Sequence, residues 1–271
     1  MASSTPVLWQ IKVSHYNEKA RWALDYKRVP HKRRAPLPLF GSTPAALLMT
    51  GRPTFPIVRL DGRAIGDSTR IVAALEARYP TPPLYPADPA ERARALELED
   101  FFDEQLAPYV RRLAFSYTSQ EGSKRFLQGV LPDSSPLTIA LLRPGGFLTT
   151  RATRGRYGAT ERNRDEASAK ILAAMDRIEA EVGPSGYLVG DAFSVADLAA
   201  AALTTQLVRP PERQHLPPIA YPEPLQSFAD AIAARPAGLW VLDTYRRHRG
   251  VSAEVRRGGA TPAPPAAAVS A

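Results

Sequence analysis

Residues 54–71 constrain the fold of this chain more than any other stretch. Residues 57–60 form a short, mostly apolar segment typical of a strand, and a return strand is expected from Ala64. Between them lies Asp61-Gly62, a pair typical of a two-residue hairpin because glycine tolerates the positive φ that the turn requires. The stretch therefore predicts two antiparallel strands joined by a tight turn.

A helix is expected directly after this hairpin. Asp67 and Ser68 are both good N-cap residues, because each carries an oxygen that can accept a hydrogen bond from a free N–H of the first helical turn. The next residues place apolar side chains on one stripe at helical spacing: Ile71, Val72, Leu75 and Tyr79. Free N–H groups at such a helix start form a natural site for a carboxylate.

Another strand–turn–helix unit opens the chain. Residues 7–13 are rich in β-branched and aromatic side chains and predict a strand. Ser14 is a good N-cap for a helix that ends near Pro30. The turn between strand and helix carries four polar side chains in a row: Ser14, His15, Tyr16 and Asn17. The opening of the chain therefore predicts a strand, a polar turn and a helix.

The opening unit resembles the N-terminal domain of glutathione transferases of the zeta and omega kinds. In those proteins a Ser or Cys lies seven residues before an Arg in an Arg-hydrophobic-Ala/Val-Leu string. Here Ser14 lies seven residues before Arg21, and residues 22–24 continue as Trp-Ala-Leu. Residues 54–71 resemble the second half of the same thioredoxin-like domain. The resemblance implies a thioredoxin-like α/β fold that binds glutathione.

The same resemblance implies which residues hold glutathione. Phe55 would offer its backbone N–H and C=O to the cysteinyl part of the tripeptide, and Pro56 would be the cis residue that opens the third strand. Asp67 and Ser68 would hold the γ-glutamyl end, with the Asp67 carboxylate facing the α-ammonium group. Arg52 is the candidate for the glycine carboxylate, although it matches the family's position only loosely.

A transferase must keep the glutathione thiol ionised at neutral pH. A free thiol titrates near 8.5, and lowering its pKa by about two units requires roughly 2.7 kcal/mol. One hydroxyl donor and a helix N-terminus can supply this, and the resemblance gives the donor role to Ser14. Tyr16 is a rival donor, and Asn17 either contacts the thiol or caps the helix. Alternatively, Ser14 is only an N-cap.

The rest of the chain predicts a helical second domain. Residues 79–89 contain five prolines and form a stiff linker. A long helix is expected from about Arg92 to Leu113, with a kink at Pro108. Residues 118–157 are only weakly periodic and predict a partly ordered cap or short helices. Five apolar side chains are candidates for the acceptor side or for plain core: Tyr109, Leu113, Phe115, Tyr117 and Phe147.

A second landmark lies near position 195. Ser194-x-x-Asp197 is a variant capping box before a nearly all-apolar helix. It resembles the structural folding box of the transferase helical domain. The resemblance then covers residues 7–245 and predicts an N-terminal thioredoxin-like domain plus an all-helical bundle. The expected divisions are a thiol-binding domain (5–80), a proline-rich linker (81–89), a helical domain (90–249) and a disordered tail (250–271).

Composition narrows the functional classes further. The 271 residues include no cysteine, which excludes disulfides, thiolate metal sites and a cysteine nucleophile. We expect no metal. The net charge is +8, but the basic clusters lack interleaved aromatic side chains, so no nucleic-acid partner is expected. No apolar run is long enough to cross a bilayer and no signal peptide is visible, so the sequence predicts a cytoplasmic protein without a membrane partner.

The sequence therefore predicts an enzyme that conjugates glutathione, its cosubstrate, to hydrophobic electrophilic small molecules. Two alternatives stay open: a glutathione-dependent isomerase of the zeta type, and a transferase-fold binding module without activity. A thiol-disulfide reductase is disfavoured because position 14 is Ser and that route needs a protein thiolate. A homodimer is expected from the family resemblance alone.

Overall fold

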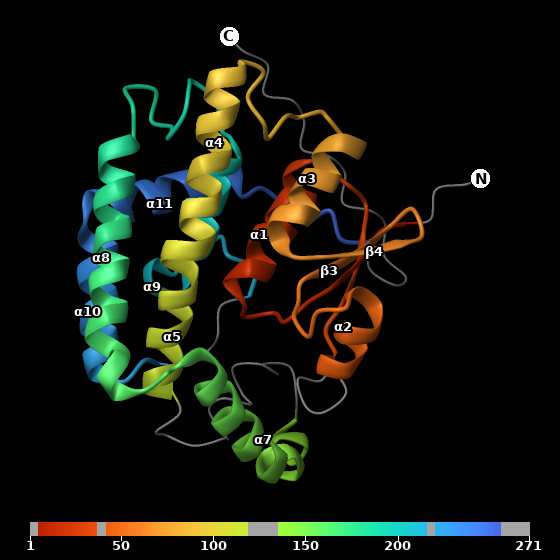
Figure 1. The fold of residues 1–271 in the computed structure, drawn as a ribbon, viewed down its shortest axis with the longest axis vertical. Helices are drawn as coiled ribbons and strands as arrows, with labels where there is room; N and C mark the ends of the chain where they lie inside the picture. Colours follow the sequence, from red (N-terminus) through yellow and green to blue (C-terminus); the bar gives the residue numbers. More distant parts are fainter. Residues whose placement is uncertain (1–4, 37–41, 119–134, 216–219, 256–271) are drawn as a thin grey trace.

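The computed structural model describes residues 5–36, 42–118, 135–215 and 220–255 (Figure 1). Its first domain holds a four-stranded sheet in the order β2-β1-β3-β4. Strand β1 runs parallel to β2 and antiparallel to β3, and β3 pairs antiparallel with β4. The strands are β1 (Val7–Trp9), β2 (Lys32–Arg34), β3 (Ile57–Leu60) and β4 (Arg63–Gly66).

Three helices complete this domain: α1 (His15–Tyr26), α2 (Ser42–Thr50) and α3 (Ser68–Arg78). Helix α1 packs against α3 and against α9 of the second domain, while α2 contacts β4. The predicted hairpin is confirmed: Asp61 and Gly62 both have positive φ, and Leu60 pairs with Arg63 across the turn. This is the thioredoxin-like arrangement that the sequence predicted.

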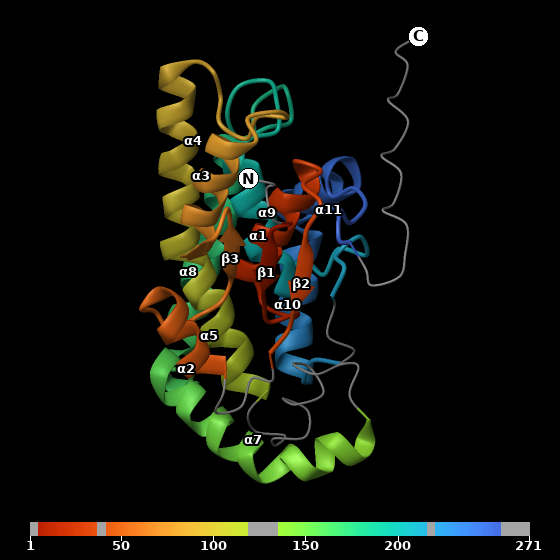
Figure 2. The same cartoon turned by 90° about the vertical axis from the view of Figure 1, so that its right-hand side faces the viewer.

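The second domain is helical, as predicted. Figure 2 shows α4 continuing into α5 along one side, with α7 lying across one end of the molecule. The elements are α4 (Pro89–Phe101), the π-helical segment η1 (Phe102–Leu106), α5 (Ala107–Thr118), α7 (Pro136–Tyr157), the short 3-10 segment η2 (Glu161–Asn163), α8 (Arg164–Glu181), α9 (Val195–Val208), α10 (Glu223–Ala234) and α11 (Pro236–His248).

The expected kink at Pro108 takes the form of a π-helical segment. Within η1 the hydrogen-bond ladder widens, and the N–H of Ala107 bonds to the carbonyl of Phe102, five residues earlier. Proline has no N–H to donate, so a local change of register lets the helix continue past it. Asp103 lies within η1, and its carboxylate accepts a hydrogen bond from Lys19 of α1.

Helix α9 forms the centre of the second domain and is buried almost throughout. Its predicted capping box is confirmed. The Asp197 carboxylate accepts hydrogen bonds from the Ser194 N–H (2.8 Å) and from the Leu188 N–H (2.9 Å), and Ser194 caps the first turn. One continuous apolar core joins α9 to α1 across the domain boundary. The two domains therefore fold onto a shared centre.

Two regions differ from the sequence-based expectation. Residues 136–157, predicted as a cap or short helices, form the single helix α7, which Ser135 caps at one end and Gly158, with a left-handed backbone, ends at the other. Part of the predicted tail is also ordered: the N–H of Val255 bonds to the carbonyl of His31 (2.8 Å), and that of Ala253 bonds to Asp25 (2.8 Å). Residues 256–271 lie outside the described part.

Candidate functional site

Strand register brings three loops to one edge of the sheet. Trp9 at the end of β1 pairs with Ile57 at the start of β3, and Ile57 pairs with Gly66 at the end of β4. The loop after β1 leads to Ser14, the residue before β3 is Pro56, and the residue after β4 is Asp67. Three segments that the sequence analysis singled out separately therefore converge on one place.

Ser14 is the N-cap of α1 and is partly exposed. Its hydroxyl oxygen accepts a hydrogen bond from the N–H of Asn17, but the N···O distance is 3.5 Å, at the long end for such a bond. A weakly held hydroxyl can turn its own proton outward. Ser14 can therefore cap the helix and still donate a hydrogen bond to an anion at the helix start.

Asn17 is fully buried, and only part of its side chain is satisfied. Its Oδ1 accepts a hydrogen bond from the N–H of Ile11 (3.1 Å), which fixes the side chain against the loop after β1. Its amide Nδ2 is buried and has no partner among the described residues. A buried amide donor normally finds an acceptor, so this group is available to a ligand.

The loop before β3 provides a backbone surface. The Phe55–Pro56 peptide bond is cis, as the resemblance implied. Pro56, directly before the first residue of β3, is buried, and Phe55 before it is partly exposed. Phe55 thus stands at the edge of the sheet that also carries Ser14 and Asp67.

Asp67 supplies a carboxylate at the start of α3. It caps that helix by accepting hydrogen bonds from the N–H groups of Thr69 (3.1 Å) and Arg70 (3.4 Å). Its φ of 80° is unusual for a residue with a side chain, and such backbone strain tends to occur at functional sites. The exposed guanidinium of Arg52 lies 3.3 Å from its Oδ2, and the next residue, Ser68, is buried.

Behind α3 lies a buried charge cluster that the sequence analysis missed. The ammonium group of Lys19 contacts Glu99 (2.8 Å), Asp103 and the hydroxyl of Thr69 (3.0 Å). Burial alone would lower the pKa of Lys19, but the two carboxylates raise it. Burial also raises the pKa of Glu99. The cluster links α1 and α3 to the second domain. Thr69, which it contacts, directly follows Ser68.

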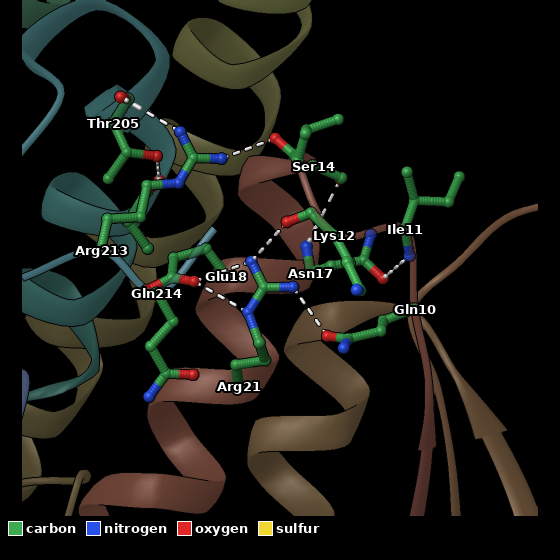
Figure 3. A network of polar contacts seen from close by, with 12 residues as sticks. Gln10, Ile11, Lys12, Ser14, Asn17, Glu18, Arg21, Thr205, Arg213 and Gln214 are labelled. Atoms are coloured by element: carbon green, nitrogen blue, oxygen red, sulfur yellow. Dashed lines mark hydrogen bonds and ion pairs between the residues drawn. The ribbon is translucent and has the colours of Figure 1, made fainter. Parts of the chain in front are cut away.

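The second domain also holds the loop that carries Ser14. Arg213 is buried and donates to the carbonyl of Val13 (2.6 Å) and to that of Thr205 at the end of α9 (3.3 Å). Gln206 donates to the same Val13 carbonyl (3.4 Å). Figure 3 shows Arg213 between Thr205 and this loop. A lone Arg in a proline-rich stretch gives no local signal, so sequence reasoning could not find it.

His15 and Tyr16 are directed toward the second domain. His15 is buried, and burial together with the charges of Arg111 and Arg213 lowers its pKa to about 3, so it is neutral at physiological pH. The hydroxyl of Tyr16 donates to the backbone carbonyl of Asp103 (3.0 Å), and burial raises its pKa. A phenol that is already engaged and hard to ionise is a weaker candidate for a thiolate donor than Ser14.

The described residues contain no group of three or more His, Asp or Glu side chains suited to hold a metal ion. Within the same part of the chain, no helix combines the length and the apolar character needed to cross a membrane. The arrangement is a set of helix N-termini, a cis-proline loop and single polar side chains. Such a site suits a peptide-like anion.

Comparison with known families matches this architecture. The glutathione S-transferase N-terminal domain matches residues 8–83, and the glutathione S-transferase C-terminal domain matches residues 161–234. Together the two models cover more than half of the chain, in the order that the fold shows. The chain therefore belongs to the glutathione S-transferase family, whose members use glutathione.

The individual relatives share only a modest part of their sequence with this chain. Protein LigF from Sphingobium sp. (strain NBRC 103272 / SYK-6) is 27% identical over 152 residues, which are 55% of this chain and 58%, less than two thirds, of LigF. The crystal structure of the beta-etherase LigF has a TM-score of 0.54 at 20% identity and covers 88% of this chain and 99% of its own.

Two further solved structures have the same fold. A glutathione S-transferase from Rhodospirillum rubrum F11 has a TM-score of 0.54 at 20% identity, with 88% of this chain and 92% of that chain covered. One from Methylobacterium radiotolerans, solved in complex with glutathione sulfonate, has a TM-score of 0.50 at 21% identity, with 88% and 95% covered. At these identities the structural likeness concerns the fold.

Proposed function

We propose that the protein is a glutathione transferase that joins the glutathione sulfur to hydrophobic electrophiles, with Ser14 stabilising the thiolate. The observation that carries this proposal is the convergence of Ser14, the cis-Pro56 loop and Asp67 at one sheet edge. The hydroxyl of Ser14 and the free N–H groups at the start of α1 would lower the pKa of the bound thiol. The thiolate would then attack the electrophile.

The other residues would hold the tripeptide. The backbone of Phe55 would pair with the cysteinyl unit, and Ser68 with Asp67 would bind the γ-glutamyl end. Arg52, expected to bind the glycine carboxylate, contacts Asp67 at 3.3 Å, and this contact favours instead a role for Arg52 at the γ-glutamyl carboxylate. The amide of Asn17 would donate to the ligand near the sulfur. Tyr16 would line the site through its ring, since its hydroxyl is bonded to Asp103.

Ser14→Ala tests the thiolate role. We expect turnover of 1-chloro-2,4-dinitrobenzene with glutathione to fall about 100-fold, the usual effect of removing one donor to a reacting anion. Circular dichroism should show an unchanged fold. Ser135→Ala is the matched control, because Ser135 also caps a helix, by accepting from the N–H of Thr138 (3.1 Å). Normal turnover by Ser14→Ala would exclude the proposed role.

Titration calorimetry with glutathione tests the site itself. Between pH 6 and 8 we expect binding accompanied by proton release, because the bound thiol would be ionised. Binding without catalysis would favour the non-catalytic module, and isomerisation of an unsaturated acid without net consumption of glutathione would favour the zeta-type reaction.

We also propose a homodimer, typical of the family, which light scattering would measure, and a cytoplasmic location.

The similarity to LigF favours a second candidate, the cleavage of an ether. In that reaction the thiolate would form a C–S bond at the carbon that carries the ether oxygen. The C–O bond would break, and the oxygen would leave with the electron pair as an alcohol or phenolate. Incubation with glutathione and an aryl ether, followed by mass spectrometry of the thioether, distinguishes this candidate from transfer to aryl halides.

A further inference from the structure

Arg111 on α5 is a cation beside the candidate site that forms no ion pair with any acidic side chain in the described part of the chain. Its side chain forms no ion pair or hydrogen bond with any residue that the structure describes, and its Nε is buried. The buried arginines Arg21 and Arg249 both pair with Glu18. Leaving a partly buried guanidinium nitrogen unsatisfied is costly, so Arg111 can gain from a partner beyond the residues that the structure describes, such as a bound ligand.

The position of Arg111 links it to the start of α1. Its guanidinium carbon lies 5.6 Å from the centre of the Tyr16 ring, two residues after Ser14, and its charge is among the causes that lower the pKa of His15. The carboxylate of Asp103, on the same stretch of helix, is paired with Lys19. Arg111 therefore adds positive potential where a substrate would approach the sulfur.

The surroundings of Arg111 are aromatic. Its guanidinium carbon lies 3.8 Å from the centre of the Tyr157 ring, and the Phe115 ring stacks on Tyr157 with centres 6.0 Å apart and planes at 12°. A guanidinium stacked on a ring keeps its N–H edge open for a planar anion. A carboxylate is the group that matches this edge, and the flanking rings favour an aromatic body.

From this geometry we propose that Arg111 selects electrophiles that are aromatic carboxylic acids. This inference rests on the proposed transferase function, because it names the acceptor of that same site. The carboxylate pairs with the Arg111 guanidinium, and the ring of the acceptor lies among Tyr16, Tyr157 and Phe115. The electrophilic carbon then faces the sulfur held at Ser14.

The test uses two acceptors that differ in one group, 4-chloro-3-nitrobenzoate and its neutral amide, 4-chloro-3-nitrobenzamide. In both, the thiolate forms a C–S bond at the ring carbon that bears chlorine, the C–Cl bond breaks, chloride leaves with the electron pair and the thiol proton passes to solvent. Each kcat/KM is divided by the uncatalysed rate constant. We expect the wild type to prefer the acid by about 10- to 100-fold, the usual effect of a charge-assisted hydrogen-bonded pair.

Variants assign the preference to Arg111. Arg111→Gln should lose about 10- to 100-fold on the acid and less than about threefold on the amide, while Arg111→Lys keeps part of the preference. Arg112→Gln is the matched control on the same helix, because Arg112 pairs with Glu166 (2.9 Å); it should affect both acceptors equally. Equal losses on both acceptors in Arg111→Gln, or no preference in the wild type, would overturn the inference.

A binding measurement separates this inference from the proposed function. Unreactive 4-methyl-3-nitrobenzoate is titrated by calorimetry into the wild type and Arg111→Gln, with 4-methyl-3-nitrobenzamide as the neutral reference. Binding of the acid alone, lost in the variant, supports the role of Arg111 even if no conjugation is detected, in which case only the transferase proposal fails. Turnover of the amide together with equal binding of acid and amide would refute the role of Arg111 and leave the transferase proposal intact.

Discussion

Two sets of buried polar groups on helix α1 differ in whether the chain provides their partners. Every buried charge along the helix has an opposite charge beside it: Glu18 contacts both Arg21 (2.7 Å) and Arg249 (2.7 Å), and Asp25 contacts Arg249 (3.0 Å). Beside these charges, the Nδ2 amide of Asn17 is buried without a hydrogen-bond partner among the described residues.

The difference separates polar groups that hold the fold from polar groups that are available for binding. Burial alone would raise the pKa of Glu18, yet the guanidinium groups of Arg249 and Arg21 hold it well below its usual range. That group gains nothing from an added ligand. The Asn17 amide finds no acceptor in the described part of the chain, so a bound molecule can supply one.

The largest effect is expected from removing a member of the paired charges on α1. Glu18→Leu leaves the guanidinium groups of Arg21 and Arg249 buried beside each other without their shared carboxylate. We expect the free energy of unfolding to fall by about 3–5 kcal/mol, the usual cost of removing one member of a buried ion pair. Urea unfolding followed by circular dichroism measures it.

An exposed pair provides the control for that experiment. Glu97 lies on α4 and contacts Arg94 (2.8 Å), with both side chains substantially exposed. Solvent screens such a pair, so Glu97→Leu should cost less than about 1 kcal/mol. If Glu18→Leu cost no more than Glu97→Leu, the contrast between structural and available polar groups would be lost.

A smaller effect is expected from the neutral His15. Its pKa in the folded state is about 3, against 6.5 for the unfolded chain, so only the unfolded chain takes up a proton in between. The stability that His15 contributes is therefore complete above pH 6.5 and is lost as the pH falls from 6.5 toward 3. The loss is about 1.4 kcal/mol per pH unit, or roughly 2 kcal/mol between pH 6.5 and 5.

His15→Gln should remove this part of the pH dependence. Urea unfolding at pH 7 and pH 5 gives the loss of stability on acidification for both proteins, and we expect that loss to be about 2 kcal/mol smaller in the variant. Identical losses would show that the His15 ring is accessible to protons in the folded state.

The smallest of these effects concerns the available amide. Asn17→Asp keeps an oxygen that can accept from the Ile11 N–H, removes the unpartnered donor and adds a negative charge that opposes an anionic ligand. We expect the affinity for glutathione, measured by calorimetry, to fall about tenfold. Asn163→Asp is the control, because the Asn163 amide already donates to the carbonyl of Gly158 (2.9 Å), away from the site. Unchanged affinity in Asn17→Asp would remove Asn17 from the site.

The sequence predicted features that depend on neighbours along the chain. The Asp61-Gly62 hairpin and the Ser194 capping box both rest on residues within a few positions, and both are confirmed. The structure of residues 136–157 was harder to predict from sequence. These residues form the single helix α7, although Pro144 and two glycines follow one another within it. Local propensity argued against a continuous helix there, and the caps at its two ends outweighed it.

Contacts between distant residues could not be predicted in the same way. Arg213 meets Val13 across 200 positions, and Arg249 meets Glu18 across 231. The chain has 35 Lys and Arg residues, and nothing in the local sequence distinguishes these two arginines from the others. The family resemblance named the loops that converge at the sheet edge, but not the side chains of the second domain that hold them.

The contact between Arg249 and α1 also has a consequence for how the protein is made. Synthesis proceeds from the N-terminus, so Glu18 and Asp25 leave the ribosome long before Arg249 is added. Until then, Asp25 lacks one of its counter-charges, and the edge beside His31 lacks the backbone partner that Ala253 and Val255 provide. The first domain therefore completes its interior only after the helical domain and residues 249–255 have been synthesised, and a product that stops before Arg249 would carry an unfinished core.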